Sequence, residues 1–324
     1  MDNLIYVVLF LILVAEFVDG WTDAPNAVAT VISTRTLSPL TAVLMATLFN
    51  LLGVFAGTAV ATTIGTEIIN ANVVNMTTIA SSMIAVIIWC SLAAFFGLPT
   101  SETHALVSGL GGAGIATAGF NVLVWAGWKK VLMGLVFSTF LGFIGGLILM
   151  TLIYHLCKNC APAKMRTSFS KLQIISSALV AFAHGSNDGQ KFMGIFALTL
   201  VLAHKIPHFM IPTWVIFLCA FVMATGTLVG GRRIIKTMGF RITNLETPQG
   251  FSAEMATGTT LAIASFLGVP LSTTHTINTA IMGVGATRRF SAVRWGVTAN
   301  IVAAWVLTFP ICGLIGYAVA LLLS

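Results

Sequence analysis

One short pattern occurs twice in this chain, about half the chain apart. The first copy spans residues 97–104 and the second spans 268–275. In each copy a Gly-x-Pro break is followed by Ser-x-Thr-His and then by a glycine-rich apolar run. A second pattern, Gly-x-x-Asp, recurs upstream of each copy, at residues 20–26 and 185–191. Because the order of the patterns is the same in both halves, the chain is predicted to be an internal duplication.

Composition indicates where such a chain folds. Hydrophobic residues make up 57% of the chain and charged residues 8%, whereas a soluble domain has about 25% charged residues. Several apolar stretches approach or exceed the ~20 residues that a helix needs to span a bilayer. They lie at 4–18, 40–62, 77–97, 130–156, 172–183, 211–230, 251–267 and 296–323. The chain is therefore predicted to be an all-α polytopic membrane protein.

The two halves are predicted to share one plan. In each half a helix breaks at the Asp motif and continues, and a full crossing follows (40–62 or 211–230). A re-entrant helical hairpin then turns at the Gly-x-Pro motif, and a long crossing ends the half. Three crossings per half require the second copy to be inverted. The predicted units are the first repeat (1–156), a cytoplasmic linker (157–171) and the second, inverted repeat (172–324).

The basic residues test this topology. If the linker is cytoplasmic, three lysines fall outside, Lys191 lies within the membrane, and the other basic residues fall on the cytoplasmic side. Positive charge is enriched on the cytoplasmic side of membrane proteins, so both termini are predicted to lie outside. The cytoplasmic set is Arg35, Lys158, Lys164, Arg166, Lys171, Arg232, Arg233, Lys236, Arg241, Arg288, Arg289 and Arg294. The net charge of +7 thus reflects topology and does not predict nucleic-acid binding.

The Gly-x-Pro motifs are predicted to form the hairpin tips. Ser101 and Ser272 are suited to cap the helices that follow, because a serine hydroxyl accepts from the free amides of the first turn. A helix N-terminus with nearby hydroxyl groups attracts anions, and in an inverted repeat the two tips can meet at mid-membrane. The residues predicted to surround one tetrahedral oxyanion are Ser101, Thr103, Ser272, Thr273 and Thr274. The alternative is that these hydroxyls bond only to their own helices.

Acidic residues within apolar segments are costly and therefore predict function. Asp23 and Asp188 are predicted to bind Na⁺ or a titrating proton, with Asn26 and Asn187 as further ligands. The alternative for this pair is structural pairing, for instance with Lys191. Glu254 is an equally balanced case between function and structure, whereas Glu16 and Asp19 are predicted to be structural.

His104 and His275 occupy equivalent positions after the capping serines. They could contact the anion or relay protons, but bracing the hairpins through backbone carbonyls is the favoured interpretation. No Walker-type loop occurs, which predicts a secondary transporter with no bound cofactor. An intramembrane hydrolase, in which one histidine activates Ser101 or Ser272, and an ion channel are remote alternatives, because duplication favours a carrier.

At these motifs the chain resembles the inorganic phosphate transporter (PiT) family. The resemblance rests on residues 20–26 and 185–191 and on the hairpin motifs 99–104 and 270–275. It implies an inverted-repeat symporter in the cell membrane that works by alternating access. The implied substrate is inorganic phosphate, imported with Na⁺ or H⁺ or as a metal–phosphate complex. It also implies a homodimer. Two departures stand out: Pro25 within the first signature, and Lys191 in place of asparagine at the end of the second.

Sulfate is the nearest competing substrate, since some relatives carry it. Monohydrogen phosphate can donate a hydrogen bond at neutral pH, whereas sulfate cannot. Glu102, which has Thr273 as its counterpart in the second hairpin, could accept that bond. A phosphate-binding role for Glu102 is therefore predicted, and its loss should reduce phosphate uptake more than sulfate uptake.

Overall fold

The structure is a computed structural model that describes residues 2–324, and this part of the chain is helical without extended strands. The first half contains α1 (Asp2–Ser33), α2 (Pro39–Val54), α3 (Ala59–Glu67), α4 (Met76–Phe96), α5 (Glu102–Ala118) and α6 (Trp125–Leu156). The second half contains α7 (Pro162–Leu202), α8 (Thr213–Val229), α9 (Arg232–Lys236), α10 (Thr247–Phe266), α11 (Thr273–Ala286) and α12 (Trp295–Leu323). Short helical turns lie at Phe120–Val122, Thr237–Arg241 and Phe290–Ala292. The all-α prediction is confirmed.

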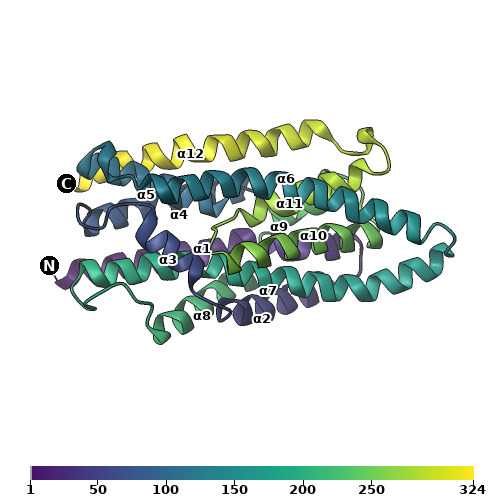
Figure 1. Cartoon of the computed structure of the whole chain (residues 1–324), viewed down its shortest axis with the longest axis horizontal. Coiled ribbons are helices and arrows are strands. Elements are labelled where there is room, and N and C mark those ends of the chain that lie inside the picture. The colour runs from purple at the N-terminus through teal and green to yellow at the C-terminus, as the bar shows by residue number, and fades with distance from the viewer. Residues whose placement is uncertain (1) are drawn as a thin grey trace.

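Length and composition allow several of these helices to cross a membrane. Within the described residues, α1, α4, α6 and α12 each qualify alone, which gives 4 spans, or up to 6 if two bent pairs are counted. The bent pairs are α2 with α3 and α8 with Arg232–Arg241. The two chain ends lie at the same end of the bundle, and the turn between α6 and α7 lies at the opposite end (Figure 1). An odd number of crossings per half gives this arrangement.

Reciprocal contacts relate the two halves. The Thr63 hydroxyl donates to the Gly268 carbonyl at 2.8 Å, and the Thr237 hydroxyl donates to the Gly97 carbonyl at 2.8 Å. Each hairpin turn is thus held by the short helical segment of the other half. Matched contacts of this kind are what an inverted repeat produces.

The halves interlock instead of forming separate bundles. Helix α5 packs along α12, and α11 packs along α6. Glycines allow both approaches: a Cβ atom at Gly112 would collide with the Gly313 carbonyl, and one at Gly283 would collide with the Phe143 carbonyl. Each hairpin is therefore enclosed by the long final helix of the opposite half.

The predicted break at the Asp motif is wrong in its position. Helices α1 and α7 run without interruption through Asp23 and Asp188, and α1 includes Pro25. Proline removes one backbone donor and adds ring bulk, and Gly231 gives the ring room, since a Cβ there would lie 2.9 Å from Pro25 Cγ. The carboxylates find partners on other helices, so unwound backbone is not needed to satisfy them.

Each half does contain a broken helix, in the span that follows. The stretch 40–62 is divided between α2 and α3, which are bent by 70°, and the stretch after α8 bends by 60° at residues 230–231. A further difference concerns the linker. Helix α7 begins at Pro162 and is 41 residues long, so only residues 157–161 separate it from α6. The division of the chain into two repeats at this point stays a prediction.

The hairpin turns lie at the Gly-x-Pro motifs, where the sequence predicts them. Gly97 and Gly268 adopt φ values of 71° and 67°, a left-handed conformation that glycine adopts without strain. Ser101 and Ser272 then cap α5 and α11 through their side chains, as predicted. The two turns meet directly, because the Thr103 hydroxyl donates to the Leu271 carbonyl at 2.8 Å.

Candidate functional site

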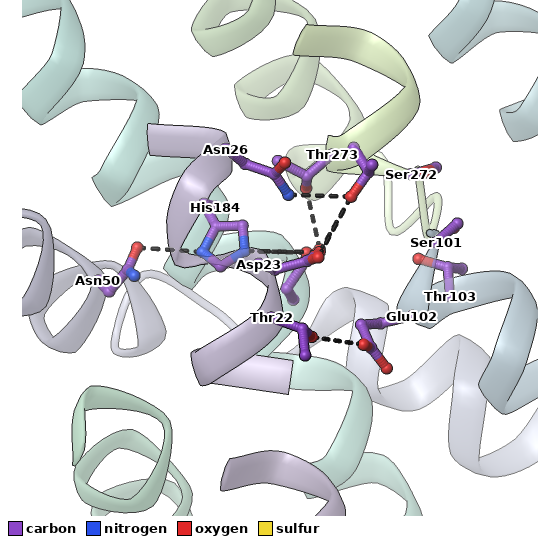
Figure 2. Close-up of polar contacts among 12 residues, drawn as sticks. Thr22, Asp23, Asn26, Asn50, Ser101, Glu102, Thr103, His184, Ser272 and Thr273 are labelled. Carbon is purple, nitrogen blue, oxygen red and sulfur yellow. Dashed lines mark hydrogen bonds and ion pairs between the residues drawn. The ribbon is translucent and has the colours of Figure 1, made fainter. Parts of the chain in front are cut away.

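The residues predicted to surround an oxyanion are brought together in the structure. Ser101 Oγ accepts from the His104 backbone N–H at 3.4 Å, and Ser272 Oγ accepts from the His275 backbone N–H at 3.2 Å. The two tips are in contact through the Thr103 hydroxyl and the Leu271 carbonyl, and Figure 2 shows Ser101, Thr103, Ser272 and Thr273 in the same region of the site. All are buried. Two helix N-termini, one from each half, therefore converge on one buried polar region.

The two predicted aspartates face each other next to the second hairpin. Thr274 Oγ1 donates to Asp23, at 3.2 Å from Oδ1 and 3.3 Å from Oδ2. Thr273 Oγ1 donates to Asp188 Oδ1 at 3.1 Å, and Asn26 Nδ2 donates to Thr274 Oγ1 at 3.0 Å. The first turn of α11 thus connects the hairpin tips to the acidic pair, as Figure 2 shows.

His184 stands between the aspartates and was not included in the predicted site. Its Nε2 lies 3.2 Å from Asp188 Oδ2 and 4.0 Å from Asp23 Oδ2, while its Nδ1 lies 3.1 Å from Asn50 Oδ1. The Thr227 hydroxyl donates to its own helix, so the Asn50 amide must donate to Thr227 and present its oxygen to His184. Nδ1 therefore carries a proton, and the contact with the carboxylates is attractive when Nε2 carries one as well.

Lys191 forms a short, buried ion pair at the site. Its Nζ lies 2.6 Å from Asp188 Oδ1, and the side chain is 1% exposed. The pairing of Lys191 with an aspartate, weighed from the sequence as the structural alternative, is therefore present for Asp188. Asp23 has no such partner within the described chain, since its nearest cationic group is His184 at 4.0 Å.

Two other predicted residues lie at the hairpins. Asn187 Nδ2 donates to Ser265 Oγ at 3.2 Å and to the Val269 carbonyl at 3.3 Å, so this amide group faces the second hairpin and not Asp188. Glu102 Oε1 accepts from the Thr22 hydroxyl at 2.6 Å, whereas its Oε2 is buried without a hydrogen-bond partner among the described residues. That free oxygen lies in the first turn of α5.

Glu254 belongs to a separate cluster. Its carboxylate accepts from Thr30 at 2.6 Å, from Gln173 at 3.1 Å and from Ser176. Thr30 follows Asp23 by seven residues, or two helical turns, so this cluster lies about 10 Å further along α1. Glu254 is therefore held by neutral donors at a distance from the hairpin tips.

The histidines brace the hairpins in a way that differs from the favoured interpretation. Neither nitrogen of the His275 ring has a hydrogen-bond partner in the described part of the chain, so it does not bond to a carbonyl group. The His275 ring stacks on Trp305 at 3.8 Å between centroids, and it meets the His104 ring edge-on at 4.7 Å. Trp305 in turn donates to the Pro99 carbonyl at 2.8 Å. Apolar enclosure by α12 explains why stacking replaces hydrogen bonding.

The acidic pair has the chemistry of a cation site. Asp23, His184 and Asp188 each place one side-chain ligand atom within 4.8 Å of the other two. Carboxylate and hydroxyl oxygens suit hard cations such as Na⁺. His184 and Asn50 could have been found as isolated polar residues inside apolar spans, but nothing in their spacing indicates that they meet.

Comparison with known proteins identifies the family to which the sequence is similar. The sequence profile of the phosphate transporter family matches residues 19–316. A probable low-affinity inorganic phosphate transporter of Rhizobium meliloti (strain 1021) is 44% identical over 315 residues, covering 97% of this chain and 93% of the relative. Its counterpart in Bacillus subtilis (strain 168) is 36% identical over 327 residues, with 98% and 97% covered.

A solved structure described as the sodium-dependent phosphate transporter superimposes with a TM-score of 0.91, covers 99% of both chains and has 25% sequence identity. The family profile spans nearly the whole chain, and the two bacterial relatives align over nearly all of it. The chain belongs to the phosphate transporter family.

Proposed function

We propose that this chain is a secondary carrier that imports inorganic phosphate together with a cation. The observation that carries the proposal is the meeting of two capped helix N-termini, α5 and α11, beside a buried pair of aspartates. Helix N-termini bind oxyanions, and the adjacent carboxylates bind cations. The names of the bacterial relatives and of the solved structure support phosphate as the anion and Na⁺ as the cation.

Phosphate would be bound by the hydroxyls and free amides at the hairpin tips. The residues are Ser101, Glu102, Thr103, Ser272, Thr273 and Thr274. Glu102 favours phosphate over sulfate, because its unpartnered Oε2 can accept the proton of monohydrogen phosphate. We expect Glu102→Gln to reduce phosphate uptake more than any sulfate uptake, and equal losses would contradict this role.

The cation would be held at Asp23, with Asn26 and Asn187 as further candidate ligands. Asp188 lies on the opposite side of the site, where its charge is already matched by Lys191. Opposite charges a few Å apart attract strongly in a medium of low dielectric constant. A cation at the aspartates therefore lowers the cost of bringing an anion to the adjacent tips, which couples the two substrates. Na⁺ is the expected cation, and a proton is the alternative.

Alternating access follows from the arrangement of the two halves. The hairpins enter from opposite sides and meet at Thr103 and Leu271, so movement of one half against the other can open the site to either side. The positive charge near the 157–161 turn supports a cytoplasmic position for that turn and an outside position for both termini. Location in the cell membrane and assembly as a homodimer are expectations that follow from the family resemblance.

An enzymatic function has less support in the geometry. In the described residues Ser101 and Ser272 are contacted by backbone N–H groups of the histidines and not by their imidazole rings. A serine activated by histidine needs the ring nitrogen as its base. The caps therefore fit anion binding better than nucleophilic catalysis.

Radiolabelled phosphate uptake into proteoliposomes tests the proposal. Purified protein would be reconstituted, and Na⁺ or proton gradients would be imposed in separate experiments with unlabelled sulfate as a competitor. We expect an inward Na⁺ gradient to drive phosphate accumulation that sulfate does not reduce. No accumulation under either gradient, or full competition by sulfate, would refute it.

A further inference from the structure

The two copies of the Asp motif differ in charge at equivalent positions. With an offset of 165 residues, Asp19 corresponds to His184, Asp23 to Asp188 and Asn26 to Lys191. The first aspartate is therefore flanked by an acid and an amide, whereas the second is flanked by two bases. Both copies are buried, so this difference determines how much additional positive charge each copy can bind.

At the second copy both carboxylate oxygens of Asp188 already face positive or donor groups. Lys191 Nζ lies 2.6 Å from Oδ1, the Thr273 hydroxyl lies 3.1 Å from the same oxygen, and His184 Nε2 lies 3.2 Å from Oδ2. At the first copy Asp23 accepts from the neutral hydroxyl of Thr274 at 3.2 Å and 3.3 Å, and His184 Nε2 is further away than from Asp188, at 4.0 Å. An added cation would be attracted to Asp23 and repelled from Asp188 by the ammonium group.

The Lys191 ammonium group needs a buried counter-ion in this environment. It is 1% exposed, and burial of an unpaired ammonium is strongly unfavourable. Asp188 Oδ1, at 2.6 Å, is the only carboxylate oxygen within ion-pair distance of Lys191 Nζ in residues 2–324. The charge of Asp188 keeps an ammonium group at this point.

We propose that Lys191 is a tethered cation that occupies the place of a second coupling ion. The chain then binds one Na⁺ fewer at the duplicated aspartates than two Asp-x-x-Asn motifs would bind. Lys191 thereby determines how many cations accompany each phosphate. This inference rests on the proposed Na⁺-coupled function and adds the number of ions to it.

Equilibrium binding of ²²Na⁺ to the purified full-length chain tests the proposal. We expect Lys191→Asn, which restores the residue of the first copy, to bind one more Na⁺ per chain than the wild type. Lys191→Arg keeps the positive charge and is the matched control, which should bind the wild-type number. The Na⁺ dependence of phosphate uptake in proteoliposomes should become steeper in Lys191→Asn, with a Hill coefficient higher by up to one.

A double variant keeps the test valid if Lys191→Asn does not fold. Asp188→Asn with Lys191→Asn removes both charges together and leaves no buried charge unpaired. The proposal predicts that it binds the same number of Na⁺ ions as the wild type, because Asp188 holds none in the wild type. Loss of one Na⁺ in the double variant, or an unchanged count in a folded Lys191→Asn variant, would overturn the proposal.

The same measurements separate this inference from the proposed function. If a Na⁺ gradient drives phosphate uptake in the wild type but the ion count does not respond to Lys191→Asn, the tethered cation alone is wrong. If neither the wild type nor its variants bind Na⁺, both the Na⁺ coupling and the tethered cation are wrong.

Discussion

Asp188→Asn would leave the ammonium group of Lys191 buried without its counter-ion. In the native chain the two groups are 2.6 Å apart, and both are at most 1% exposed. Removing one partner of a buried ion pair costs about 3–5 kcal/mol, because the other charge is left uncompensated. We therefore expect Asp188→Asn to lower the free energy of unfolding by about that amount.

Asp23→Asn is the matched control, because it removes the same charge at the equivalent position of the other half. Asp23 accepts from the neutral hydroxyl of Thr274, and the oxygen of an asparagine amide can accept the same bond. A change of about 1 kcal/mol or less is expected there. The contrast between the two variants isolates the effect of the lysine.

Thermal unfolding in detergent, without Na⁺ and phosphate, measures the contrast. At roughly 2–4 °C per kcal/mol for a large domain, the apparent Tm of Asp188→Asn should fall by about 6–20 °C. Adding Lys191→Asn should recover most of that loss. Equal shifts for Asp188→Asn and Asp23→Asn, or no recovery in the double variant, would refute the ion-pair reasoning.

Three further outcomes are expected. Gly112→Ala should destabilise the chain by about 1–3 kcal/mol through overpacking against α12. Gly313→Ala should not, because a Cβ atom there would lie 3.6 Å from the Ser108 carbonyl oxygen, an ordinary contact distance; thermal unfolding compares the two variants. Thr22→Val removes the hydrogen bond to Glu102 and should weaken phosphate binding, measured as a higher KM for uptake. Glu254→Gln replaces one acceptor oxygen with an NH2 group that faces hydrogen-bond donors, so it should lower the free energy of unfolding by about 1–3 kcal/mol, measured by thermal unfolding.

Local chemistry made the hairpins predictable from the sequence. Gly97 and Gly268 take left-handed conformations, and Ser101 and Ser272 cap the following helices, because these roles depend on residues within one turn. Duplication then indicated that the tips meet.

Long-range partners could not be predicted in the same way. The continuity of α1 through Pro25 depends on Gly231, which is distant in the sequence and leaves room for the proline ring. The hydrogen-bond partner of His184 Nδ1 is Asn50, which lies on α2. Beyond the bend after α2, α3 contacts the hairpin turn of the other half through Thr63 and Gly268. Each of these features requires knowledge of which helices touch.

Equilibrium binding of radiolabelled phosphate tests the central claim most directly. Ser101→Ala combined with Ser272→Ala removes both caps at the converging helix N-termini, while Ser108→Ala removes a buried serine on α5 that bonds to its own helix. In the presence of Na⁺, we expect the double variant to bind phosphate at least about tenfold more weakly, which corresponds to about 1.4 kcal/mol, and Ser108→Ala to bind as the wild type does. Unchanged affinity in a folded double variant would contradict a phosphate site at the hairpin tips.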